Sequence, residues 1–134
     1  MKVYIATKWE NKPAAREVRK QLIEMGHKVT SQWLDTGEYD GPAEIAAQRD
    51  INDVLDADVL LLLQDGYNIE GGCGMWVEMG IAIAEGMPVV VISNTLTKRS
   101  VFHSAWNVDI IKTVGDLRAY FNTEVSMVSD EVTQ

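Results

Sequence analysis

Short apolar runs alternate with amphipathic stretches along the chain, and this alternation predicts five strands. The expected strands cover residues 3–6, 28–33, 58–63, 89–92 and 110–111, of which 28–33 is a mixed segment and the others are apolar runs. After Asp58 the third run is an unbroken series of Val and Leu. A run of this kind is typical of a strand that is buried on both faces of a parallel sheet.

The stretches between these runs predict four helices. The first helix starts near Asn11 and Pro13 and stops at Gly26, and the second opens at Pro42. The third covers about residues 75–85 and the fourth residues 114–121. The apolar stripe expected on the second helix consists of Ile45, Ile51, Val54 and Leu55.

Strands that alternate with helices at this spacing predict an α/β fold, a doubly wound parallel sheet with helices on both faces. We expect one domain over residues 1–122, followed by a polar tail at 123–134. Ligands of such sheets bind in the crevice beyond the carboxyl ends of the strands. That rule selects three loops as candidates for the functional site, namely 7–12, 64–74 and 93–100.

The loop at 64–74 is rich in glycine and includes Gly71, Gly72 and Gly74. Glycine allows positive φ and lets a ligand approach backbone N–H groups at the start of a helix. Glycine content alone is also compatible with a merely flexible loop. No Lys follows the glycines, and no glycine stands between Thr7 and Asn11 after the first strand, so we expect neither ATP hydrolysis nor NAD chemistry.

Charge narrows the function further, because 12 Lys and Arg against 20 Asp and Glu give a net charge of −8. This balance argues against a sequence-independent nucleic-acid binder, although a local pocket could still hold a small anion. A single cysteine, Cys73, excludes an internal disulfide and a Cys-rich zinc site. No apolar run approaches the roughly 20 residues of a membrane span, and no signal peptide precedes the first strand. We therefore expect a cytoplasmic protein without a membrane partner.

Glu78 lies about one turn into the third helix, beside the glycine-rich loop. An acid at that position can simply complement the helix dipole. However, Val77, Gly80, Ile81 and Ala84 share one helical face that we expect to pack on the sheet, and Glu78 stands only about 100° from it. Gly80 also suggests close packing at that point, because glycine is a poor helix former. A carboxylate at this edge could act as a nucleophile, and both interpretations stay open.

Asp50 and Asp53 stand three residues apart on the second helix, with Arg49 beside them as a pairing partner. Most such pairs belong to a solvated acidic face. If one of them shares the crevice with Glu78, two carboxylates flank one site. Cleavage of a glycosidic bond uses such an arrangement, with one group on the sugar and another managing the proton of the leaving group.

Four Trp residues are many for this length. Trp9 and Trp33 follow predicted strand ends, where a flat base could stack on them, whereas core filling accounts for at least one Trp. We expect Trp76 and Trp106 to serve packing or subunit contacts.

Cys73 could be nucleophilic at a helix start, but a buried or incidental thiol is the simpler interpretation, because no His is near it in the sequence. His27 and His103 lack the spacing of metal ligands, so we expect no metal and no cofactor.

Several motifs together resemble the nucleoside 2-deoxyribosyltransferase family, over about residues 2–121. The glycine-rich loop with the block around Glu78 is the most specific of them. The matching segments are Val3-Tyr4-Ile5-Ala6, Thr30-Ser31-Gln32-Trp33-Leu34, Arg49-Asp50-Ile51-Asn52-Asp53, Ala57-Asp58-Val59, Gly71-Gly72 with Gly74, Val77-Glu78 with Gly80 and Ala82, Gly86 with Pro88-Val89-Val90-Val91, and Val101-Phe102-His103.

The resemblance implies a flavodoxin-like sheet of five strands and cleavage of the N-glycosidic bond of 2′-deoxynucleosides, with deoxyribose transferred to a second base. It implies that Glu78 is the nucleophile, that Asp50 handles the base and its proton, and that Trp9 lines the base site. A neighbouring subunit completes the site in this family with a residue that falls on Ser100, so a homo-oligomer is implied. The other residues taken as substrate contacts are Tyr4, Trp33, Asp53, Asp65, Gly71, Gly72 and Gly74.

Two departures from the family pattern concern the substrate. Transferases that act on free nucleosides usually carry Asn at the position of Ser100, whereas the related 5′-monophosphate N-hydrolases carry Ser there to meet the phosphate. Gly72 stands where the transferases place an acid and the hydrolases a Ser, and Glu70 is the nearest acid. The first loop lacks the phosphate cradle of the hydrolases, although Thr7 and Lys8 could partly replace it. We favour a nucleoside substrate and keep two alternatives, a monophosphate hydrolase and a non-catalytic nucleotide-binding module.

Overall fold

The computed structural model describes residues 1–37, 41–65 and 73–122, and the polar segment at 123–134 lies outside these ranges. Its centre is one sheet of five strands in the order β2-β1-β3-β4-β5, and every neighbouring pair is parallel. The strands are β1 (Lys2–Ala6), β2 (Lys28–Val29), β3 (Val59–Leu63), β4 (Val89–Ile92) and β5 (Val108–Ile111). The predicted α/β class and parallel sheet are confirmed, and this strand order is the flavodoxin-like one.

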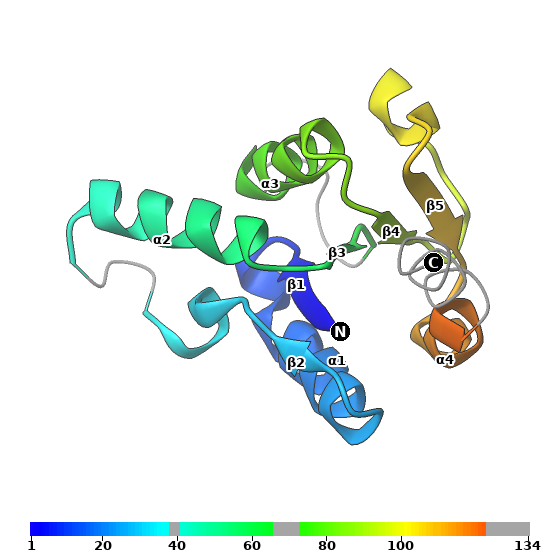
Figure 1. Ribbon diagram of the computed structural model, residues 1–134, viewed down its shortest axis with the longest axis horizontal. Helices are drawn as coiled ribbons and strands as arrows, with labels where there is room; N and C mark the ends of the chain where they lie inside the picture. The colour runs from blue at the N-terminus through cyan, green and yellow to red at the C-terminus, as the bar shows by residue number, and fades with distance from the viewer. Residues whose placement is uncertain (38–40, 66–72, 123–134) are drawn as a thin grey trace, which may run out of the picture.

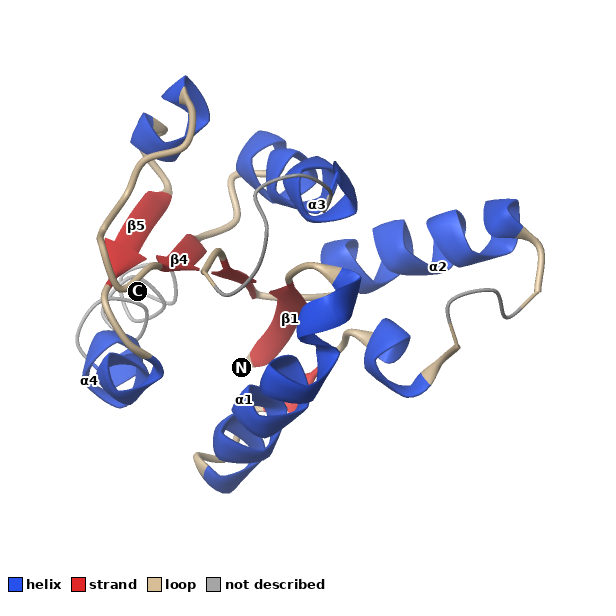
Figure 2. Cartoon of the chain, turned by 180° about the vertical axis from the view of Figure 1, so that it is seen from behind, coloured by secondary structure: helices blue, strands red, loops and turns tan. Residues whose placement is uncertain are grey.

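Helices cover both faces of the sheet (Figure 1). The helix pair α2 and α3 lies on one face, and α1 and α4 lie on the other, as the view from behind also shows (Figure 2). The helices are α1 (Lys12–Glu24), α2 (Ala43–Leu55), α3 (Cys73–Ala84) and α4 (Leu117–Tyr120). No helix in the described ranges has the length and apolar character needed to cross a membrane.

The core follows from the central strands, since every residue of β3 and β4 is buried. Burying one such aliphatic side chain stabilises the fold by about 1.5–3 kcal/mol. After β1 the chain adds β2 on one side and then crosses to place β3 on the other. The loops after β1 and β3 therefore leave the sheet in opposite directions. The crevice expected between them lies above the carboxyl ends of these two strands.

The strand predicted over 28–33 is wrong beyond Val29. There the chain leaves the sheet and forms a 3₁₀ turn, Gln32–Asp35. Side chains take over the hydrogen bonds that a longer strand would have made. The Ser31 hydroxyl accepts from the Ile5 N–H at 3.2 Å, and the Asp53 carboxylate accepts from the Gln32 N–H at 3.1 Å.

The expected faces of two helices are also wrong in part. On α3 the buried side chains are Met75, Met79 and Ala82, while Val77 of the predicted face is 62% exposed. This helix carries apolar residues on nearly every side, so periodicity does not orient it. On α2, Ile45 is exposed because the first turns of the helix extend past the sheet (Figure 1).

Candidate functional site

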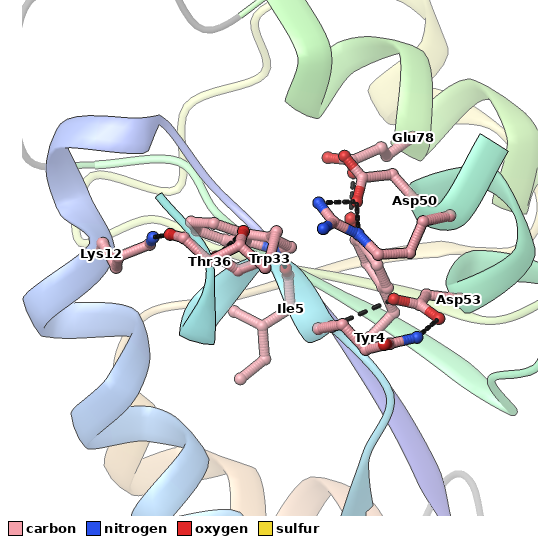
Figure 3. A network of polar contacts seen from close by, with 10 residues as sticks. Tyr4, Ile5, Lys12, Trp33, Thr36, Asp50, Asp53 and Glu78 are labelled. Atoms are coloured by element: carbon pink, nitrogen blue, oxygen red, sulfur yellow. Dashed lines mark hydrogen bonds and ion pairs between the residues drawn. The ribbon is translucent and has the colours of Figure 1, made fainter. Parts of the chain in front are cut away.

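The contact between Tyr4 and Glu78 is the centre of the candidate site (Figure 3). Tyr4 lies on β1, is fully buried and points to the face of the sheet that α3 covers. Its hydroxyl donates a hydrogen bond to the Glu78 Oε2 atom. Glu78 is half-buried on α3, between exposed Val77 and Met79, which packs in the core. The Glu78 carboxylate is thereby held against the sheet and does not extend into solvent.

Burial raises the pKa of the Glu78 carboxyl group to about 8. The hydrogen bond from Tyr4 acts in the opposite direction and lowers this pKa, because it stabilises the carboxylate. The charges of Asp50 and Asp53 raise it further. Burial followed by the charge of Glu78 raises the pKa of the Tyr4 phenol well above its ordinary range, so Tyr4 stays a donor.

Asp50 lies on α2, which packs against α3, and its side chain reaches the neighbourhood of Glu78 (Figure 3). Burial raises the pKa of Asp50, and an ion pair with Arg49 at 3.2 Å partly offsets this effect. The structure therefore brings together Tyr4, Asp50 and Glu78 from three elements. Two carboxylates with raised pKa values in one place are a common property of catalytic sites.

Asp53 has a mainly structural position, since it is only 7% exposed and holds the turn after β2. Its two carboxylate oxygens accept from the backbone and the side chain of Gln32, at 3.1 and 2.8 Å. Asp53 acts on Glu78 through its charge and not through contact with it. The spacing of residues on the second helix predicts that Asp53 lies near the site, but it does not predict that Gln32 is its partner.

The two tryptophans form one aromatic cluster beside the carboxyl end of β1. Trp33 is 6% exposed, and its indole N–H donates to the Ile5 carbonyl at 2.9 Å. The ring centroids of Trp9 and Trp33 are 6.1 Å apart. The Lys12 ammonium lies 3.7 Å from the centroid of Trp9 and donates to the Thr36 carbonyl oxygen. Trp33 is therefore a core residue that supports the cluster, and Trp9 is its half-buried outer member.

The remaining candidates lie at the ends of β3 and β4. Asp65 accepts from the Asn94 N–H and from the Ser93 hydroxyl, so its carboxylate links the two loops. Gly74 is exposed in the first turn of α3, while Gly71 and Gly72 lie outside the described residues. The Thr7 hydroxyl donates to the Leu63 carbonyl at 2.8 Å and accepts from the Asn11 side-chain amide at 3.0 Å.

Ser100 lies at the rim of a groove of about 540 Å³. The groove is lined by Trp76, Met79, Gly80, Ile83, Arg99, Ser100 and Phe102. Gly80 does not pack closely against this chain as expected, because a Cβ placed there would meet no atom within 4 Å. Trp106 is 85% exposed, so it is not a packing residue of this chain.

Two polar residues near Ser100 escaped the sequence analysis as parts of a site. The sequence gives buried His103 no role in the site beyond its place in a matching motif, yet its ring lies between Ser100 and Gln64, at 3.4 and 2.6 Å. Gln64 carried no signal beyond its place at the end of an apolar strand. Among the described residues, no group of three or more His, Cys, Asp or Glu side chains could hold a metal ion.

Comparison with known proteins identifies the family of this chain. The sequence profile described as nucleoside 2-deoxyribosyltransferase matches residues 3–123. The chain belongs to the nucleoside 2-deoxyribosyltransferase family. Membership places this transferase-family chain among enzymes of the N-glycosidase and deoxyribosyltransferase class. A search of curated protein sequences finds no match.

Solved structures similar to this family member share its fold. A 2-deoxyribosyltransferase from Bacillus psychrosaccharolyticus has a TM-score of 0.67 at 22% identity, over 90% of this chain and 92% of that one. A CMP N-glycosidase from Clostridium botulinum has a TM-score of 0.64 at 15% identity, over 90% and 100%. A conserved protein from Enterococcus faecalis V583 has a TM-score of 0.63 at 17% identity, over 87% and 94%.

Replacing Glu78 by Gln should stabilise the protein at alkaline pH. The folded state holds the Glu78 proton up to a pKa of about 8, whereas an unfolded Glu releases it near 4.5. The wild type therefore loses stability as pH rises from about 4.5 to about 8, and Glu78→Gln does not. We expect Glu78→Gln to melt about 5 °C above the wild type at pH 9, with a smaller difference at pH 5. Exposed Glu85, changed to Gln, controls for net charge, and equal pH slopes in all three proteins would contradict the assignment.

Tyr4→Phe should move the ionisation of Glu78 to higher pH. The Tyr4 hydrogen bond lowers the pKa of Glu78, so its loss leaves burial and the neighbouring charges unopposed. The acid limb of the pH profile of kcat/KM should shift upward by about one pH unit. A lower rate with an unmoved acid limb would mean that Tyr4 acts in another way.

Proposed function

We propose that this protein cleaves the N-glycosidic bond of 2′-deoxynucleosides and transfers deoxyribose to another nucleobase, through a covalent intermediate on Glu78. The observation that carries the proposal is the half-buried Glu78 carboxylate, held by the Tyr4 hydroxyl next to Asp50. Family membership supports the class of reaction. No cofactor is needed, because the substrate supplies both the sugar and the leaving base.

In the first step a Glu78 oxygen bonds to C1′ while the bond from C1′ to the base nitrogen breaks. The electron pair of the broken bond stays on the base, and Asp50 supplies its proton. A raised pKa suits Asp50 to this role, because it favours the protonated form that can donate to the leaving base. In the second step a nitrogen of the incoming base attacks C1′, Glu78 leaves as carboxylate, and Asp50 takes the proton back.

Glu78 must be ionised to attack, and Asp50 must be protonated to donate. The two groups repel each other as anions, so a single shared proton is favoured. Tyr4 stabilises the anion on Glu78, which biases the proton towards Asp50. Arg49 acts against this bias by pairing with Asp50.

Trp9 is proposed as the wall on which the base stacks, supported by Trp33 and Lys12. The backbone of the loop with Gly71, Gly72 and Gly74, together with Asp65, is proposed to border the sugar. Ser100 is proposed to face the 5′ position of the sugar.

A hydrolase of 2′-deoxynucleoside 5′-monophosphates is the second candidate. Two observations favour it: Ser100 carries a hydroxyl at the position proposed for the 5′ group, and Lys98 and Arg99 precede it as exposed cations. Water would then replace the second base in the deglycosylation step.

A base-exchange assay separates these candidates. The protein is incubated with one 2′-deoxynucleoside or its 5′-monophosphate and a different free base, and the products are identified by mass spectrometry. Transfer predicts a new nucleoside, and hydrolysis predicts free deoxyribose or its phosphate. Recovery of intact bound ligand would instead indicate a binding module without turnover.

Glu78→Ala should reduce turnover by more than about a thousandfold while the melting transition is retained. A 2′-fluoro-substituted nucleoside, whose fluorine disfavours positive charge at C1′, should leave a sugar adduct on a peptide that contains Glu78. An adduct on Asp50 or on another residue would refute the assignment of the nucleophile.

We further propose that the protein acts as a homo-oligomer whose subunits meet over the groove beside Ser100. Phe102 lines this groove and is exposed. Val77 and Trp106 are further large apolar side chains that no part of the same chain covers. Gly80 leaves space above α3 for another chain to approach. Ser100 would then serve the site of the neighbouring subunit.

Phe102→Asp should dissociate the oligomer and lower activity by at least about tenfold, because a charge would be buried at the contact. Ile23→Asp places the same charge on an exposed apolar position of α1, across the sheet, and serves as the matched control. Sedimentation velocity and activity are measured over a dilution series. A fully active monomer would contradict the proposal.

A further inference from the structure

The β4–β5 loop contains a directed chain of hydrogen bonds that includes the Ser100 hydroxyl. The Gln64 amide nitrogen donates to the Thr97 carbonyl at 2.8 Å, which fixes the orientation of the Gln64 side chain. The Gln64 oxygen must then accept, and its partner is the His103 Nε2 atom at 2.6 Å. His103 therefore carries its proton on Nε2 and presents Nδ1 as an acceptor.

Ser100 is the next member of this chain. Its oxygen accepts from the Phe102 N–H at 3.2 Å and lies 3.4 Å from the His103 Nδ1 atom. Because Nδ1 has no proton, the hydrogen of the Ser100 hydroxyl points towards the ring. One lone pair of the Ser100 oxygen is left for a ligand, so Ser100 meets a ligand as an acceptor.

The surroundings of His103 favour this direction of hydrogen bonding. His103 is 2% exposed, and its ring packs edge-on against Trp76 with the centroids 5.7 Å apart. Burial lowers the pKa of His103, the nearby charges of Arg99 and Lys98 lower it further, and a hydrogen bond with the Ser100 backbone raises it. Gln64, which follows β3, and Trp76 on α3 contact the ring and are uncharged. The neutral ring is thus the form that the surroundings favour.

We propose that His103 is a positioning residue that determines substrate specificity: through Gln64 it makes Ser100 an acceptor and so favours a free 5′-hydroxyl over a 5′-phosphate. A 5′-hydroxyl can donate its hydrogen to Ser100, whereas a phosphate dianion has no hydrogen to give and needs donors. The inference rests on the proposed function, in which Ser100 faces the 5′ position. Of the two proposed substrate classes, this inference favours the 2′-deoxynucleoside over its 5′-monophosphate.

The test compares a 2′-deoxynucleoside with its 5′-monophosphate, both by kcat/KM in the full chain and by affinity in the Glu78→Ala variant. His103→Leu removes the acceptor next to Ser100, and Gln64→Leu removes the group that fixes the tautomer. Each should shift the preference towards the monophosphate by about tenfold, the worth of one hydrogen bond. His103→Asn keeps an acceptor near the Nδ1 position and should shift it much less.

The Ser100→Ala background provides the double-mutant control, because His103→Leu should leave the preference unchanged there. Melting curves report folding, and Gln64→Leu carries the test if His103→Leu does not fold. An unchanged preference in Gln64→Leu or His103→Leu, or an equal shift in His103→Asn, would overturn the inference. Absence of a sugar adduct on Glu78 would refute the proposed function separately, since the affinities in Glu78→Ala do not depend on turnover.

Discussion

The burial of the Glu78 carboxylate against Tyr4 is the constraint on which the rest of the site depends. A buried carboxylate is costly to ionise unless fixed groups replace the water that it has lost. Tyr4 can replace that water because β1 is an inner strand of the sheet, between β2 and β3, so its backbone is held on both sides. The donor is in place before any ligand arrives. Stability is given up at one residue, and the proposed nucleophile gains a defined position.

Electrostatics link this residue to α2. Asp50 and Asp53 both raise the pKa of Glu78, but they differ in their own partners. Asp53 is held by Gln32, whereas Asp50 pairs with the adjacent Arg49 and stays half-buried. Of the two, Asp50 is therefore the one that can exchange a proton with a ligand.

The sequence predicts most of the fold because the signal is strong where burial is complete. The runs that form β3 and β4 are apolar at every position, and the structure has them within one residue of the prediction. Prediction fails where distant side chains decide the backbone, as at Gln32, whose N–H is captured by Asp53 from α2. It also fails on α3, where apolar residues surround the axis. Glu78 and Asp50 can be found from their sequence motifs. The contact between Tyr4 and Glu78 cannot, because it joins residues 74 positions apart and leaves no local sequence pattern.

Chemistry and recognition are carried by different kinds of structure in this protein. The groups proposed for the reaction stand on β1, α2 and α3, which pack together in the sheet and its covering helices. Ser100 stands on a loop, where the polarity of its hydroxyl is set by neighbours that do not touch the nucleophile. A change at Gln64 or His103 can alter which ligand is accepted while the carboxylates keep their geometry. The same fold can therefore serve substrates that differ only at one end. A single side chain can change whether the hydroxyl that we propose to contact that end donates or accepts a hydrogen bond.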